Sequence, residues 1–132
     1  MPQSIFVNLA VESVQKSRYF YSGLGFAINE QYSNEQAACV VIADNIFVML
    51  LAKPFFSGFT DKAIVDAHAM TEVLNCLDCE SRQRVDQLVK LAEQHGGKAY
   101  REAKDQGFMY GHAFEDLDGH IWELVYMEAQ VG

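Results

Sequence analysis

The chain has 132 residues, of which 50% are hydrophobic, 12% are aromatic and 21% are charged. This composition predicts one globular domain with a sizeable core and excludes a disordered chain. The 18 acidic and 10 basic residues give a formal net charge of -8, so nucleic acid, whose phosphates are also negative, is not an expected partner.

The first half of the chain predicts a strand, a helix and three more strands. Residues 5–11 (IFVNLAV) alternate apolar and other side chains with the period of a strand. A helix is expected over residues 14–22, with Ser13 as its cap and Gly23 at its end. The further strands are expected at residues 26–32, 37–43 and 46–51.

Residues 53–70 form the one long stretch without a regular pattern, and they contain Pro54, Phe55, Phe56 and Phe59. The stretch can be a linker whose aromatic side chains pack on a sheet or a partner. It can also be a lid over a pocket, because long loops inside compact domains are often functional. The sequence leaves both interpretations open.

The second half predicts the same order of elements as the first. Residues 72–77 (EVLNCL) resemble a strand, and a helix is expected over residues 82–95, between Ser81 and the pair Gly96-Gly97. Three more strands are expected at residues 98–103, 108–114 and 121–127.

This order predicts an α+β fold in which two βαβββ modules build a curved mixed sheet around a cavity. The modules are residues 1–52 and 71–132, and residues 53–70 connect them. One helix covers only one face of each sheet, so the other face needs a second module and often a second chain. We therefore expect a cavity that binds a small molecule, and a homodimer.

The cysteines predict free thiols in a reducing compartment. Their number is odd, namely Cys39, Cys76 and Cys79, which argues against a disulfide framework. Cys76 and Cys79 have the C-x-x-C spacing of redox and zinc sites, but no second pair completes a zinc cage. The first residues lack the pattern of a signal peptide, and the longest apolar run, 46–52, is too short for a membrane span. We expect a cytoplasmic protein without membrane contact.

Two segments resemble the vicinal oxygen chelate superfamily, which includes glyoxalases, bleomycin resistance proteins and dihydroxybiphenyl dioxygenases. Residues 6–26 (FVNLAVESVQKSRYFYSGLGF) resemble its opening strand and helix, and residues 114–124 (FEDLDGHIWEL) resemble its closing hairpin. The segments FMYGHAFEDLDGHIWE and VMLLAKPFF resemble a bacterial subgroup labelled glyoxalase-like. The resemblance implies the glyoxalase-like fold.

The resemblance also implies four positions for the ligands of a divalent metal, namely Phe6, Met49, Glu72 and Glu123. Phe6 has no donor atom, and the thioether of Met49 is a poor partner for a hard ion. Glu72 and Glu123 alone can hold only a weakly bound ion with water in its other positions. The cofactor is therefore expected to be a weakly bound divalent metal or none.

Three residues are candidates for catalysis. Glu123 lies in an apolar strand and can be a general base or metal ligand, or a carboxylate at the mouth of a solvated cavity. Glu72 can be its partner, or can be exposed at a strand start. His112 lies where alternation places Tyr110, His112 and Phe114 on one face, and it can point into the cavity or to the surface.

The resemblance places five further side chains around the cavity, although simple core packing is the alternative for each. These expected ligand-binding residues are Phe6, Asn8, Phe47, Met49 and Tyr110. One hypothesis for the function is a lyase or isomerase acting on an oxygenated metabolite or thiol adduct. A second is a metal-free drug-binding protein of the bleomycin resistance type, and a third is a dimer without small-molecule chemistry.

Overall fold

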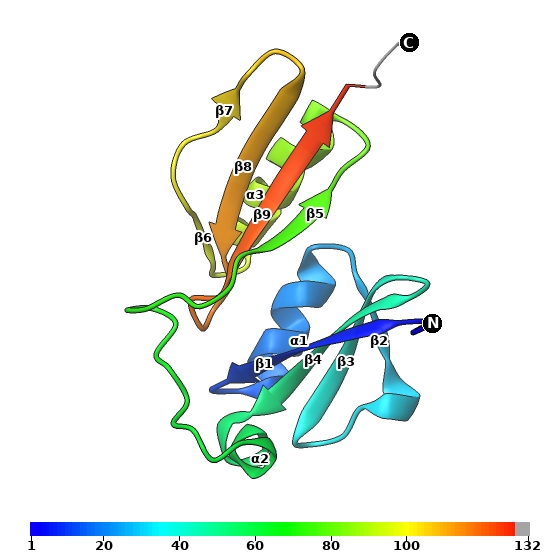
Figure 1. Ribbon diagram of the computed structural model, residues 1–132, viewed down its shortest axis with the longest axis vertical. Coiled ribbons are helices and arrows are strands. Elements are labelled where there is room, and N and C mark those ends of the chain that lie inside the picture. The colour runs from blue at the N-terminus through cyan, green and yellow to red at the C-terminus, as the bar shows by residue number, and fades with distance from the viewer. Residues whose placement is uncertain (129–132) are drawn as a thin grey trace. The chain divides into compact units, whose positions relative to one another are not determined.

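The structure of the protein, a computed structural model, describes residues 1–128 (Figure 1). The chain divides into two compact units, with the boundary between Asp66 and Ala67, and each unit is described by itself. Each contains a mixed sheet and one long helix, as expected for the predicted α+β fold. That fold class is confirmed.

The first unit has a four-stranded sheet in the order β1-β4-β3-β2, in which β1 and β4 are parallel and the other pairs are antiparallel. Its elements are β1 (Ile5–Val11), α1 (Val14–Gly23), β2 (Ala27–Asn29), the 3-10 helix η1 (Glu30–Tyr32), β3 (Ala37–Ala43), β4 (Ile46–Ala52), α2 (Lys53–Phe56) and the 3-10 helix η2 (Ser57–Phe59).

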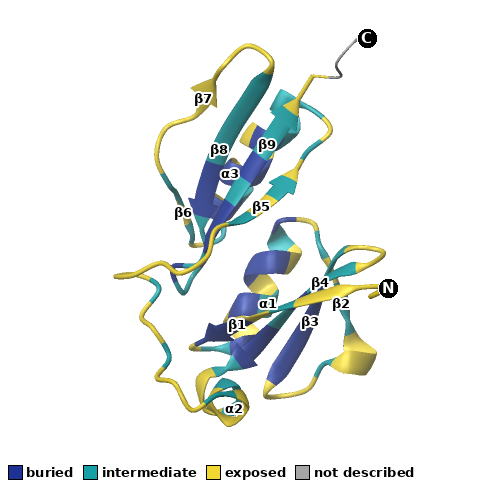
Figure 2. Ribbon diagram, viewed as in Figure 1, coloured by how far each residue is buried: buried dark blue, intermediate teal, exposed yellow. Residues whose placement is uncertain are grey.

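The helix α1 begins where the sequence predicts, because the Ser13 hydroxyl accepts a hydrogen bond from the Lys16 amide at 3.1 Å. It packs on β3 and β4, and the side chains on that face of the sheet are the most buried. Val40, Val48 and Leu50 have no exposed surface. The opposite face, called here the open face of the unit, has no helix of its own and is more exposed (Figure 2).

The second unit has β5, β9, β8 and β6 in that order, with β7 also paired to β8. The pair β5–β9 is parallel and the others are antiparallel. Its elements are β5 (Asn75–Asp78), α3 (Arg82–Gln94), β6 (Lys98–Ala99), β7 (Lys104–Asp105), β8 (Met109–Glu115) and β9 (Ile121–Met127).

The helix α3 is capped by the Ser81 hydroxyl, which accepts from the Arg84 amide at 3.0 Å. Val85, Leu88, Val89 and Ala92 are its buried side chains, as the helical spacing predicts. They pack on β8 and β9, so this unit also has one helix-covered face and one open face. Both helix predictions are confirmed.

Four predicted segments differ from the structure. The strand predicted at 26–32 ends at Asn29, whose side chain accepts from the Gln31 amide and starts a 3-10 turn. The strand predicted at 72–77 is the later β5, and residues 53–59 contain two short helices. The strand predicted at 98–103 stops at Ala99, because Arg101 has a φ of 65°, which no extended strand allows.

The three cysteines are free thiols, of which Cys39 is buried, Cys79 is half-buried and Cys76 is exposed. Within residues 1–128, every helix is too short or too polar to cross a bilayer.

Candidate functional site

The strand register shows which predicted residues share a face. On β9, Glu123 lies opposite Ala113 of β8 and beside Cys76 of β5. Directly paired residues point to the same side of a sheet, and the neighbouring pair Gly111 and Val125 repeats this face. Cys76 is exposed, which identifies it as the open face of the second unit.

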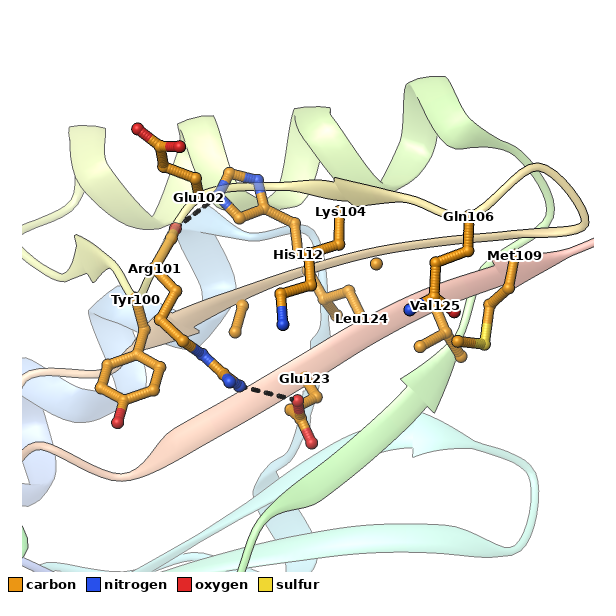
Figure 3. Close-up of a pocket in the computed structure, with 12 residues that line it drawn as sticks. Tyr100, Arg101, Glu102, Lys104, Gln106, Met109, His112, Glu123, Leu124 and Val125 are labelled. Carbon is orange, nitrogen blue, oxygen red and sulfur yellow. Dashed lines mark hydrogen bonds and ion pairs between the residues drawn. The ribbon is translucent and has the colours of Figure 1, made fainter.

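A pocket of about 150 Å³ lies on this open face (Figure 3). Met109, Gly111, Ala113 and Val125 contribute apolar surface to it, and Arg101 and Glu123 contribute opposite charges. Its full lining consists of Tyr100, Arg101, Glu102, Lys104, Gln106, Met109, Gly111, His112, Ala113, Glu123, Leu124 and Val125.

Arg101 connects the loop after β6 to Glu123. One guanidinium nitrogen, Nη2, lies 3.1 Å from Oε2 of Glu123, and the two side chains are 51% and 32% exposed. The guanidinium also lies over the ring of Tyr100, 5.1 Å from its centre, where a cation is attracted to the ring face. Arg101 is the one described non-glycine residue with a positive φ, a conformation that clusters at functional sites.

His112 supports Arg101 from the helix-covered face. It lies opposite the fully buried Leu124, and its Nε2 donates to the Arg101 carbonyl at 3.1 Å. Figure 3 shows the ring directed toward the loop of Arg101 and Glu102, away from the Glu123 carboxylate. The other ring nitrogen, Nδ1, is buried without a hydrogen-bond partner. The ring thus fixes the backbone of Arg101, and a catalytic role for it stays a prediction.

Tyr110 lies on the same helix-covered face as His112, as alternation predicts. Its hydroxyl donates to Oδ1 of Asp86 on α3 at 2.5 Å, and Arg82 lies 5.5 Å from its ring centre. The hydrogen bond to Asp86, together with burial, raises the pKa of Tyr110 to about 12. Tyr110 is therefore held against the helix and is not among the residues that line the pocket.

Glu72 is exposed in a bend three residues before β5 begins, and it does not line the pocket. The structure places another residue at the position predicted for a metal ligand. Met49 pairs with Asn8 as Glu123 pairs with Cys76, so the residue equivalent to Phe6 is two before Cys76, namely Leu74. The alignment that selected Glu72 is thus two residues out, and its role as ligand or partner is only a prediction.

The four ligand-binding residues predicted in the first unit share its open face. Phe6 pairs with Phe47, and Asn8 pairs with Met49. The rings of Phe6 and Phe47 are stacked, with centres 4.7 Å apart and planes 14° apart, and Phe6 is 47% exposed. The shared face agrees with the sequence analysis, and ligand contact there stays a prediction.

These residues do not fit the metal site that the resemblance implies. The equivalent positions hold Phe6, Met49, Leu74 and Glu123, of which Glu123 alone offers a hard oxygen ligand. Among residues 1–128, no three His, Cys, Asp or Glu side chains are grouped as a metal site requires. The Glu123 carboxylate is already paired with Arg101.

The C-x-x-C cysteines do not have the character of reactive thiols. Although Cys76 is exposed, partial desolvation of its thiol raises its pKa, and the nearby charges of Glu123 and Asp78 raise it further. Burial is also the main cause of the raised pKa of Cys79. Because the thiolate is the nucleophile and the metal ligand, this agrees with the interpretation of Cys76 and Cys79 as ordinary thiols.

Arg101 is the site residue that sequence reasoning missed. The segment KAYREA, residues 98–103, was predicted as a strand, and nothing in its letters predicts a positive φ at an arginine. One available signal was the cluster of alternating charges between Lys98 and Asp105, which is unusual for the interior of a sheet.

Comparisons with known proteins give relatives in structure. No protein-family model and no curated protein matches the chain. The hypothetical protein SA1046 from S. aureus has 30% identity and a TM-score of 0.82, over 96% of this chain and 95% of that one.

Two further structures have lower identity. A glyoxalase-related enzyme from Fulvimarina pelagi has 18% identity and a TM-score of 0.80, over 96% of this chain and 88% of that one. A bleomycin resistance determinant encoded on the transposon Tn5 has 17% identity and a TM-score of 0.66, over 96% and 98%. At these identities the likeness shows a shared fold.

Proposed function

We propose that this chain is a small-molecule-binding protein that works without a metal ion. The chain belongs to one family with SA1046 of S. aureus, and it has the fold of the glyoxalase and bleomycin resistance proteins. The proposed ligand site is the pocket on the open face of the second unit. Shared fold alone does not assign a reaction, so the proposal depends on the chemistry of the pocket.

The observation that carries the proposal is the pairing of Glu123 with Arg101 at 3.1 Å. A divalent cation bound to Glu123 would lie close to the Arg101 guanidinium, and a bare ion brings no anion of its own to compensate that repulsion. An organic ligand meets no such conflict, because the pair offers a hydrogen-bond donor and an acceptor beside an apolar surface. Such combinations of a few polar groups with apolar walls are typical of small-molecule sites.

In the first unit, we propose that the stacked rings of Phe6 and Phe47 contact an apolar part of a ligand, together with Asn8 and Met49. Phe6 is 47% exposed and stacked on Phe47, and adjoining exposed apolar side chains are typical of surfaces that bind a partner or ligand. Its replacement by Ala should weaken binding of any aromatic ligand that is found.

Metal content and thermal melts test the proposal. Protein purified without chelator is analysed for metals and then melted with Mg, Mn, Ni, Zn and Fe(II). We expect no stoichiometric metal and no rise in the melting temperature, since a ligand raises apparent stability only if it binds the folded state. A near-stoichiometric metal that is lost in Glu123→Gln, but kept in the matched variant Glu115→Gln, would contradict the proposal.

A lyase or isomerase acting on an oxygenated metabolite or thiol adduct is the second candidate. The observation that favours it is that Glu123 is one-third exposed in the pocket and has a cation at 3.1 Å. Glu123 could then accept a proton from the substrate while Arg101 stabilised the developing negative oxygen. If an activity is found, Glu123→Gln should abolish it, and unchanged turnover in that variant would exclude this candidate.

We also propose that the protein is a homodimer in the cytoplasm. The exposed Ile5 and Phe6 of β1 support the dimer, and the three free cysteines support a reducing compartment. Analytical ultracentrifugation should give twice the mass of 14.9 kDa, and a monomer at micromolar concentration would contradict the dimer.

A further inference from the structure

The residues that line the pocket of the second unit include both signs of charge, and Figure 3 shows the Arg101 guanidinium and the Glu123 carboxylate meeting there while the Glu102 carboxylate is directed away from them. Arg101 and Lys104 are positive, and Glu102 and Glu123 are negative. A ligand with a single charge would be attracted to one member of the Arg101–Glu123 pair and repelled by the other. A ligand that carries both charges can be complementary to both members.

The positive member of the central pair is held in place from three directions. Its backbone carbonyl accepts from Nε2 of His112, its guanidinium lies over the Tyr100 ring, and Nη2 contacts Glu123. Preorganised groups lose less conformational freedom when a ligand binds. The guanidinium has five N–H donors in a planar fork, and its contact with Glu123 uses one nitrogen.

The pair itself is weak enough to be opened by a ligand. Its side chains are 51% and 32% exposed, and ion pairs with such exposure contribute little net stability because water and salt screen them. A ligand carboxylate can replace Glu123 at Arg101, provided that a ligand cation compensates Glu123 at the same time.

The size of the pocket limits the ligand. A volume of about 150 Å³ holds roughly five waters or one molecule about the size of benzene, which corresponds to a small metabolite and not to a large drug. Gly111 leaves its floor open, since a Cβ there would meet Leu124 O at 3.7 Å and Val125 Cγ1 at 3.8 Å.

From these observations we propose that the pocket binds a free α-amino acid or a similar small zwitterion. The ligand carboxylate pairs with Arg101, its ammonium group pairs with Glu123, and its side chain lies on the apolar surface of Met109, Ala113 and Val125. In an α-amino acid one carbon atom separates the ammonium and carboxylate groups. This short spacing suits Arg101 and Glu123, because their charged groups are already in contact. This inference rests on the proposed function, because it names the ligand class of the same site.

The test is a titration of metal-free, isotope-labelled protein with the common L-α-amino acids, followed by amide chemical shifts. We expect at least one of them to shift amides of the pocket residues. The N-acetyl derivative lacks the cation and the carboxamide lacks the anion, so each should bind at least about tenfold more weakly, as expected for the loss of a charge-assisted hydrogen bond.

Two matched variants separate the pocket from general effects of charge. Arg101→Gln should reduce affinity for the amino acid by about tenfold or more. Arg18→Gln removes an Arg–Glu pair of the first unit, whose side chains are 30% and 71% exposed, and it should leave the affinity unchanged.

Other outcomes would overturn the inference. Equal binding of the amino acid and its N-acetyl derivative, or no amino acid binding at all, excludes a zwitterion site. A parallel titration with neutral aromatic and aliphatic fragments separates the two proposals. If fragments shift the pocket amides and amino acids do not, the binding function stands and the ligand class is wrong, whereas no shift with either excludes both.

Discussion

In the first unit, the open face around the pair Asn8 and Met49 is mainly apolar, whereas the equivalent pair in the second unit is Cys76 and Glu123. Both units use the same parallel pairing of a first and a last strand, and both place one helix behind the sheet. The repeated fold therefore fixes the direction in which a side chain at each position points, whereas the residue at that position decides which chemical group is presented.

The two units also differ in the charge beside this position. In the second unit an irregular loop after β6 brings the positive Arg101 to Glu123 on the open face. In the first unit the strand neighbours of Met49 are the uncharged residues Asn8 and Cys39. A carboxylate on a half-buried strand needs a partner. The Arg101 loop is therefore what makes Glu123 tolerable in its strand.

The largest expected effect concerns the core between helix and sheet, which both units have. Phe20 of α1 and Phe114 of β8 are 1% and 2% exposed. Replacement of either by Ala should lower the free energy of unfolding by about 3–5 kcal/mol, because each leaves a cavity between helix and sheet.

Urea unfolding measures this change. The control Phe6→Ala on the open face should cost about 1 kcal/mol or less, because Phe6 is half exposed. An equal cost for Phe6 and Phe20 would contradict the division into a helix-covered core and an open face.

The next largest effect concerns a turn that differs between the units. Gly119 in the turn before β9 has a φ of 90°, and a Cβ there would lie 2.7 Å from the His68 backbone nitrogen. The corresponding turn of the first unit uses Asp44-Asn45 and no glycine. Gly119→Ala should therefore destabilise the fold by about 2 kcal/mol.

The matched control for this turn is Gly58→Ala, where a Cβ would meet nothing within 4 Å. Thermal unfolding of the two variants gives the comparison. If both melt at the temperature of the parent protein, then the tight approach between Gly119 and His68 does not matter for stability.

An exchange of side chains tests the difference in chemistry directly. Met49→Glu places a carboxylate on the open face of the first unit, beside Asn8 and Cys39, and should cost about 1–3 kcal/mol. Glu123→Met removes one member of an exposed pair in the second unit and should cost less than about 1 kcal/mol. Denaturant unfolding measures both costs. A cost for Met49→Glu as small as that for Glu123→Met would show that a carboxylate on this face needs no partner, and would contradict the role given to the Arg101 loop.

The smallest effect is a dependence of stability on alkaline pH in the second unit. The pKa of Tyr110 is raised from 10.0 to about 12, mainly by its hydrogen bond to Asp86, so the folded state keeps a proton that the unfolded chain loses. This contribution is fully present below pH 10 and is lost as the pH rises to about 12.

Melting temperatures between pH 9 and pH 12 measure this contribution of Tyr110, because the interval spans the pKa values of the unfolded and the folded state. Tyr110→Phe should flatten the alkaline fall relative to Tyr126→Phe, a matched variant on the cross-strand neighbour of Tyr110. Identical curves for the two variants would show that the Asp86 contact is not formed.

Much of the fold could be predicted from the sequence. The caps Ser13 and Ser81 and the buried stripe of α3 are local signals, and they gave both helices close to their observed bounds. The alternation on β8 separated Tyr110 and His112 from Met109 and Ala113. These features depend on neighbours a few residues apart, which a single sequence contains.

The site could be predicted only in part. Glu123 was found because it belongs to a recognisable closing segment, but its partner Arg101 is 22 residues away and depends on a backbone angle. Glu72 was selected by alignment with the family's motifs, and the strand expected to begin there, β5, begins three residues later. Such errors arise where pairing between distant segments, and not local pattern, fixes the register.

The central claim is that the open face of the second unit is a small-molecule site that needs no metal. The most direct measurement is amide chemical-shift mapping of chelator-treated protein with a library of small metabolites, compared with Gly111→Leu, which fills the pocket floor. We expect shifts at residues 100–113 and 123–125 that are lost in Gly111→Leu. Shifts that require an added divalent metal, or that persist unchanged in Gly111→Leu, would contradict this claim.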